Sequence, residues 1–221
     1  MTTWMKNAFI SLGMTEACTQ YFSHCAQPYS FSVYLPKSRF EQVILLESPK
    51  IKLIFSTCDR QCYDDFCAMF TRMTGISVEL ADNMWMIRKV AEVIEKDIPG
   101  NRVHIRMMSP LIVIRADCQN PETGPRLLGV RDASFNASIN SGIHTLLTAL
   151  GHDGLIGSVS VDPCQDGFTH KEVHVLHDGR YLRTTIGDLS LAASPDLIRF
   201  LYRSGMGEMR EKGFGLFEII E

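Results

Sequence analysis

The chain has 221 residues, of which 45% are hydrophobic, and its formal net charge is −3. This length predicts one large domain or two small ones, and the hydrophobic content excludes an intrinsically disordered chain. No apolar run approaches the length of a membrane span, and Ser11, Gly13 and Thr15 interrupt the N-terminal segment, so we expect a cytoplasmic protein without a signal peptide. Most of the seven cysteines should then be small buried hydrophobes.

The sequence pattern of residues 1–98 predicts a unit with the order helix, strand, strand, helix, strand. Ile51, Leu53 and Phe55 alternate as in a half-buried strand, whereas the apolar residues between 59 and 73 follow a helical period. The expected helices are residues 1–22, broken near Gly13, and 59–73, and the expected strands are 30–35, 50–56 and 77–80, with 84–94 ambiguous between strand and helix.

Residues 99–221 predict the order of a ferredoxin-like βαββαβ unit. Asp178-Gly179 indicates a hairpin turn. The expected strands are residues 103–107, 111–116, 156–161, 172–176, 181–186 and 214–220; the expected helices are 135–150 and 195–203; residues 120–126 should form a loop. Together the two units predict an α+β fold of two ferredoxin-like halves in tandem.

The first unit lacks the strand that opens the second. In a ferredoxin-like sheet that strand is central, so its loss would expose a strand edge and part of the core. We therefore expect another element or a partner to cover the exposed edge.

Four glycines surround a short charged run near the C-terminal end: Gly205, Gly207, Gly213 and Gly215, with Arg210 and Lys212 between them. A helix C-cap and the start of a strand would account for two of the glycines. The pattern is neither a dinucleotide-binding fingerprint nor a Walker loop. The remaining glycines and the two cations indicate a loop that holds an anion, with backbone N–H groups and both cations directed at phosphates.

This spacing resembles the glycine-rich loop of the CRISPR repeat-processing endoribonucleases, which belong to the RAMP superfamily. Two further segments carry the resemblance. Residues 108–115, Met-Ser-Pro-Leu-Ile-Val-Ile-Arg, are similar to the family's Ser-Pro followed by an apolar strand, and residues 21–32 are similar to its N-terminal histidine and aromatic-Ser strand. The order agrees over nearly the whole chain.

The resemblance implies an endoribonuclease that cleaves CRISPR repeat RNA without a metal or other cofactor and leaves 2′,3′-cyclic phosphate and 5′-hydroxyl ends. It implies that His24, in the half formed by residues 1–98, is the general base, because histidine titrates near neutral pH. Other subunits of a CRISPR effector complex are possible partners, and no membrane is expected. The implied RNA-binding residues are Gly205, Gly207, Arg210, Lys212, Gly213, Gly215, Lys37 and Lys52.

Other interpretations remain open. His24 could simply cap a helix end, and the family's usual lysine is replaced by Gln27, while no tyrosine precedes Tyr21. These departures favour a non-catalytic RNA-binding subunit of the same superfamily. The net negative charge is also compatible with an unrelated ferredoxin-like enzyme or sensor for small molecules.

A zinc site is not expected from the cysteines. Cys58 and Cys62 share a helical face, but Cys67 lies on the opposite side. His170 and His174 fall on one face of a strand without the spacing of a metalloprotease motif.

Overall fold

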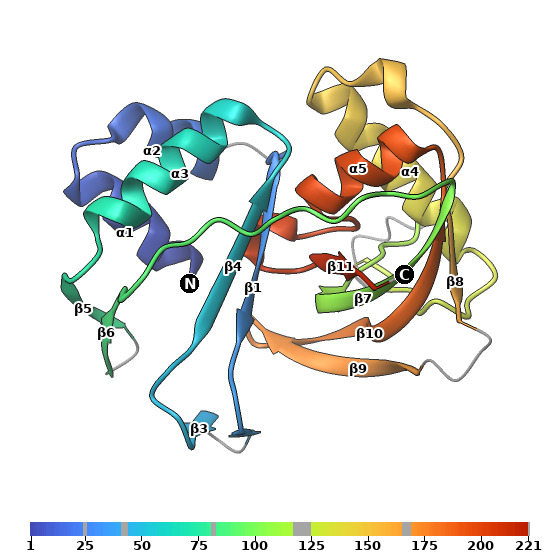
Figure 1. Ribbon diagram of the computed structural model, residues 1–221. Coiled ribbons are helices and arrows are strands. Elements are labelled where there is room, and N and C mark those ends of the chain that lie inside the picture. The colour runs from blue at the N-terminus through green and yellow to red at the C-terminus, as the bar shows by residue number, and fades with distance from the viewer. Residues whose placement is uncertain (24–25, 41–43, 81–82, 117–124, 165–168, 221) are drawn as a thin grey trace.

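The computed structural model describes residues 1–23, 26–40, 44–80, 83–116, 125–164 and 169–220. Helices and strands occur in both halves, as an α+β fold requires, and the two halves lie side by side (Figure 1).

The C-terminal half confirms the βαββαβ prediction. Its main sheet has the antiparallel order β11-β7-β10-β8, the 4-1-3-2 order of a ferredoxin-like unit. The strand that is second along the chain of a ferredoxin-like unit is here divided into β8 and β9, which pair with opposite ends of the long β10. Its elements are β7 (Arg102–Leu111), α4 (Phe135–Ala149), η1 (Asp153–Leu155), β8 (Ser160–Pro163), β9 (His170–His177), β10 (Arg180–Ala192), α5 (Pro195–Ser204), η2 (Arg210–Lys212) and β11 (Phe217–Ile219).

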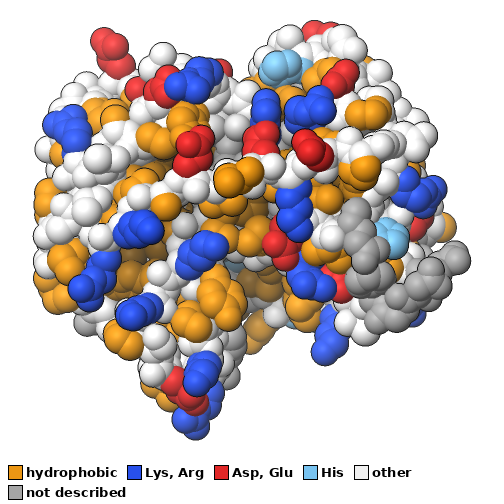
Figure 2. Space-filling view, viewed as in Figure 1, with side chains coloured by type: hydrophobic (Ala, Val, Ile, Leu, Met, Phe, Trp, Pro, Cys, Tyr) orange, Lys and Arg blue, Asp and Glu red, His pale blue; other side chains and the backbone are white. Residues whose placement is uncertain are grey.

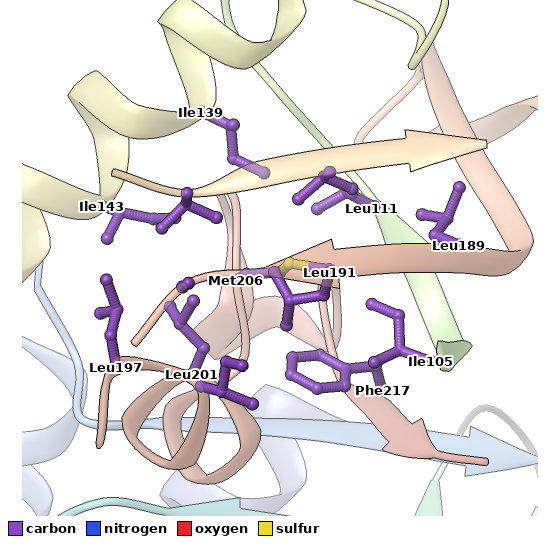
Figure 3. Packing of buried hydrophobic residues seen from close by; sticks show 14 of the residues in the cluster. Ile105, Leu111, Ile139, Ile143, Leu189, Leu191, Leu197, Leu201, Met206 and Phe217 are labelled. Carbon is purple, nitrogen blue, oxygen red and sulfur yellow. The ribbon is translucent and has the colours of Figure 1, made fainter. Parts of the chain in front are cut away.

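The core of this half lies between the sheet and the helices α4 and α5. Burial alternates along β7, so that Val103, Ile105 and Met107 point to the core. Figure 3 shows how side chains from α4, α5 and the strands meet in this layer. Helix α5 begins where the sequence predicts, because the Ser194 hydroxyl accepts a hydrogen bond from the Leu197 N–H.

The N-terminal half differs from the prediction in its sheet. Within the described residues, β1 and β4 form a sheet of two antiparallel strands. The predicted strand at 77–80 exists as β5, but it pairs with β6 in a separate hairpin, and residues 87–101 form no helix or strand. The elements are α1 (Thr2–Ser11), α2 (Thr15–Phe22), β1 (Tyr29–Tyr34), β2 (Ser38–Phe40), β3 (Ile44–Leu46), β4 (Lys52–Thr57), α3 (Arg60–Arg72), β5 (Ser77–Leu80) and β6 (Asn83–Met86).

Helices α1, α2 and α3 cover one face of the β1–β4 sheet with an aromatic core. Phe66 of α3 is fully buried, and its ring centroid lies 4.2 Å from that of Phe55 and 4.9 Å from that of Phe9. Helix α3 begins at an Asp59 cap, whose carboxylate accepts a 2.6 Å hydrogen bond from the Cys62 N–H. The opposite face of this small sheet is free of helices from its own half and meets the C-terminal half.

Candidate functional site

The two halves meet along a row of serines on β1. Tyr29 and Phe31 point to the aromatic core, so the alternation of a strand directs Ser30 and Ser32 to the other face. The Ser30 hydroxyl donates a 2.8 Å hydrogen bond to the Phe214 carbonyl oxygen, and the Ser32 hydroxyl donates to the Met108 carbonyl oxygen. Small hydroxyl side chains therefore let the glycine-rich loop pack directly on β1.

Close packing accounts for the four glycines of the loop, residues 205–215. A Cβ atom on Gly215 would lie 1.9 Å from the Met206 carbonyl oxygen, and one on Gly213 would lie 2.7 Å from the Phe31 ring. All four have positive φ angles: 74° at Gly205, 79° at Gly207, 91° at Gly213 and 74° at Gly215. Only glycine adopts this conformation without strain and leaves room for these neighbours.

Five backbone N–H groups of the loop donate hydrogen bonds inside the protein. The N–H of Met206 donates to Gly215, that of Glu208 to Ile112, and that of Gly215 to Pro110, at 2.9–3.0 Å. The N–H groups of Lys212 and Gly213 donate within the short helix η2. These five N–H groups already have acceptors inside the protein, and contact of the loop with RNA stays a prediction.

The two cations of the loop have different surroundings. Arg210 is only 6% exposed, and its Nη1 donates a 3.0 Å hydrogen bond to the Ser204 carbonyl oxygen at the end of α5. Burial lowers the pKa of the Arg210 guanidinium. This placement argues against the prediction that Arg210 holds an RNA phosphate, because the guanidinium faces inward. Lys212 is exposed, with its Nζ 3.9 Å from Asp178, and a role in RNA binding stays a prediction.

Lys37 and Lys52, the predicted cations of the N-terminal half, are both exposed. Lys37 lies in the turn before β2, and Lys52 begins β4. Figure 2 shows Lys and Arg side chains gathered over β4 and the β2–β3 hairpin, beside a hollow between the halves in which hydrophobic side chains are visible. Their contact with RNA stays a prediction.

A pocket of about 340 Å³ lies between the two halves. His24 itself lies outside the described residues, so its predicted role stays a prediction. The pocket is bounded by the end of α2, the start of β1, the start of α3 and the end of α4. Its lining residues are Gln20, Tyr21, Ala26, Gln27, Pro28, Cys58, Asp59, Ala149, Leu150 and His152.

Two pocket residues at positions relevant to the resemblance have structural roles. The Tyr21 hydroxyl donates a 2.8 Å hydrogen bond to Asp65, and burial raises the pKa of this phenol. Gln27 is 2% exposed, and its side-chain amide donates to the Gln20 carbonyl oxygen at 3.4 Å. Neither residue supplies the cation that the family's lysine would bring.

His152 is the pocket residue that the sequence analysis missed. It follows α4 and comes from the C-terminal half, more than a hundred residues along the chain from His24. No motif surrounds it, so only the folded arrangement of the two halves reveals it.

Of the five cysteines that the structure describes, Cys18 and Cys62 are buried and the other three are half-buried, so the prediction that most are buried is wrong for these residues. Burial raises the pKa of Cys58 to about 11 and that of Cys62 to about 12. Among the residues that the structure describes, no group of three or more His, Cys, Asp or Glu side chains could hold a metal ion. A search of the same residues finds no helix long and apolar enough to cross a membrane.

A family model described as CRISPR associated protein Cas6, C-terminal, matches residues 93–219, more than half of the chain. The chain belongs to the Cas6 family. This membership confirms the resemblance, and the matched residues include the glycine-rich loop and residues 108–115. Among curated proteins, no sequence matches the chain.

Solved structures related to Cas6 share the whole fold. A structure described as the characterization of a Cas6-related gene from Pyrococcus furiosus has a TM-score of 0.84 at 15% identity and covers 100% of this chain and 89% of its own. An RAMP protein described as binding different RNA substrates has a TM-score of 0.80 at 16% identity, with 100% and 90% covered. A Cas6 product complex has a TM-score of 0.68 at 13% identity, with 99% and 92% covered. The tandem ferredoxin-like prediction is thereby confirmed.

Proposed function

We propose that this chain is an endoribonuclease that cleaves CRISPR repeat RNA to crRNA. The observation that carries the proposal is the Cas6 family match over residues 93–219. The structures similar to this one that are described as an RNA-binding RAMP protein and a Cas6 product complex support the same kind of substrate.

The proposed reaction uses the RNA's own 2′-hydroxyl as nucleophile, so it needs no metal-bound water. His24 removes the 2′ proton, the 2′-oxygen attacks the adjacent phosphorus, and the bond to the 5′-oxygen breaks as that oxygen takes up a proton. The products carry a 2′,3′-cyclic phosphate and a 5′-hydroxyl. Lys212, Lys37 and Lys52 are exposed cations that would contact repeat phosphates, which should make binding salt-dependent.

The test is cleavage of a labelled repeat RNA by the purified chain in excess chelator. We expect cleavage at one position, with no cleavage after the nucleotide 5′ to that position is replaced by its 2′-deoxy form. His24→Ala should slow single-turnover cleavage by about a hundredfold to ten-thousandfold while repeat affinity changes only a few-fold. Loss of cleavage in chelator, or wild-type rates in His24→Ala, would contradict this mechanism.

A non-catalytic RNA-binding subunit is the second candidate. It is favoured by the residue at the position of the family's lysine, because Gln27 is neutral and its amide donates to Gln20. The Tyr21 hydroxyl is likewise bonded to Asp65. Tight repeat binding without cleavage would support this candidate, whether the subunit acts alone or in a CRISPR effector complex. The predicted division at residues 98 and 99, with the histidine in one half and the loop in the other, is kept in both proposals.

A further inference from the structure

Among the described residues, the pocket between the halves is lined by four titratable side chains: Tyr21, Cys58, Asp59 and His152. Two come from the N-terminal half around the start of α3, and His152 comes from the opposite wall, after α4. A ribose cleavage needs two proton transfers, one from the 2′-hydroxyl and one to the leaving 5′-oxygen. The inference that follows rests on the proposed function and concerns the second transfer.

Three of the pocket's titratable groups are engaged elsewhere. The Asp59 carboxylate caps α3 through its 2.6 Å bond with the Cys62 N–H. The Tyr21 hydroxyl already donates to Asp65, and burial raises its pKa. The Cys58 thiol donates to the Pro28 carbonyl oxygen at 3.4 Å, and burial raises its pKa to about 11, too high to exchange protons efficiently at neutral pH.

His152 is exposed, and among the described residues its ring nitrogens make no hydrogen bond. Its backbone is nevertheless fixed, because its N–H donates a 2.8 Å bond to Leu147 and its carbonyl accepts one from Leu155. The ring packs edge-on against Phe200, with centroids 5.1 Å apart. The backbone of His152 is therefore fixed and one side of its ring is supported by an apolar side chain. Its ring nitrogens can then contact a substrate atom from a defined position.

The two carboxylates near His152 already accept hydrogen bonds within the protein. Asp59 faces the pocket from α3 but is used as the helix cap. Asp153, the next residue, accepts a 2.7 Å hydrogen bond from the Thr148 hydroxyl. A phosphate diester bound in the pocket would place an anionic group next to the His152 ring.

We propose that His152 is the general acid of the cleavage. As the 2′-oxygen bonds to phosphorus and the bond from phosphorus to the 5′-oxygen breaks, the His152 imidazolium gives its proton to that 5′-oxygen. The step leaves a neutral imidazole, a free 5′-hydroxyl and the cyclic phosphate, and water then restores the proton to His152. The site is thus completed by a residue of the C-terminal half.

The first measurement is the pH dependence of single-turnover cleavage by the full chain. A base that must be neutral and an acid that must be protonated give a bell-shaped profile. His152→Ala should be slower by about a hundredfold or more and should lose the decline at high pH, with repeat affinity within a few-fold of wild type. His174→Ala, which changes an exposed histidine on β9, is the matched control and should retain the wild-type rate and profile.

The second measurement uses a repeat RNA in which sulfur replaces the 5′-bridging oxygen at the cleavage site. A thiolate leaves without being protonated, so His152→Ala should cut this RNA at nearly the wild-type rate. His24→Ala should stay slow on it, because the base is still needed. A variant that is merely misfolded would be slow on both substrates.

The outcomes separate the two proposals. If the wild type cuts the repeat and His152→Ala cuts it equally fast, or if sulfur gives no rescue, His152 is not the general acid and the proposed function stands. If the wild type binds the repeat but does not cut it, the proposed function fails first, and the role of His152 fails with it.

Discussion

Replacing Gly215 by alanine should destabilise the whole fold, because this glycine combines a positive φ with a tight contact. A φ of 74° costs a residue with a Cβ about 1–2 kcal/mol. The added carbon would also lie 1.9 Å from the Met206 carbonyl oxygen, so the loop must move and weaken the 3.0 Å bond from the Met206 N–H, which is worth about 1 kcal/mol. We expect a loss of about 3 kcal/mol or more.

Two other glycines provide matched controls. Gly13→Ala introduces a Cβ at a φ of 72° with no atom within 4 Å, so it isolates the backbone strain. Gly100→Ala has neither the positive φ nor a close neighbour, and it should change stability by about 0.5 kcal/mol or less.

Urea denaturation followed by circular dichroism measures all three variants, with the midpoint reporting stability if the slope is unchanged. For a chain of this size the Gly215→Ala melting temperature should fall by about 6–12 °C. If Gly215→Ala loses no more stability than Gly13→Ala, the packing argument is refuted. RNA binding would then be the remaining explanation for this glycine.

Four further variants test the glycine-rich loop, the contact between β1 and that loop, and one ion pair. Arg210→Ala should cost about 2 kcal/mol of stability, because it leaves the Ser204 carbonyl and a buried volume unfilled, whereas Lys212→Ala should leave stability unchanged and lower the slope of log affinity against log salt by about one. Ser30→Ala should cost about 1 kcal/mol in urea denaturation. Arg203 lowers the pKa of Glu95, and the pair is partly exposed. We expect the pair to add about 0.5 kcal/mol to the free energy of unfolding above pH 4.5 and to lose this contribution as the pH falls through the lowered pKa. Glu95→Gln should therefore be less stable than wild type at pH 7 and equally stable at pH 2.

Local patterns were sufficient to predict most elements of the fold. The alternation in residues 50–56, the helical period in 59–73 and the Asp178-Gly179 turn all act between near neighbours, and the structure has β4, α3 and the β9–β10 hairpin there. Pairing was harder to predict. The strand at 77–80 has the right local pattern, but its partner depends on the turn that follows, and it forms a hairpin with β6 instead of joining β1 and β4.

The candidate site was predictable only where a motif marks it. The glycine spacing identified the loop, but it did not reveal that Arg210 turns inward, since burial depends on β1 and α5 rather than on the loop's own residues. The pocket is assembled from four segments of both halves, so nothing in the sequence near His152 could have indicated it.

The packing of the loop on β1 also explains how the N-terminal half tolerates a sheet of two strands. Two strands alone are marginally stable, and the aromatic core covers only one face of this pair. On the other face, Ser30 and Ser56 donate hydrogen bonds to backbone carbonyls of the C-terminal half, and η2 packs against β1. The glycine-rich loop and α5 therefore cover a face of this sheet, whereas the sequence analysis expected a cover for a strand edge. Because that covering comes from the other half, a change that loosens the loop should also loosen the start of β1, which bounds the pocket, and stability and cleavage should be lost together.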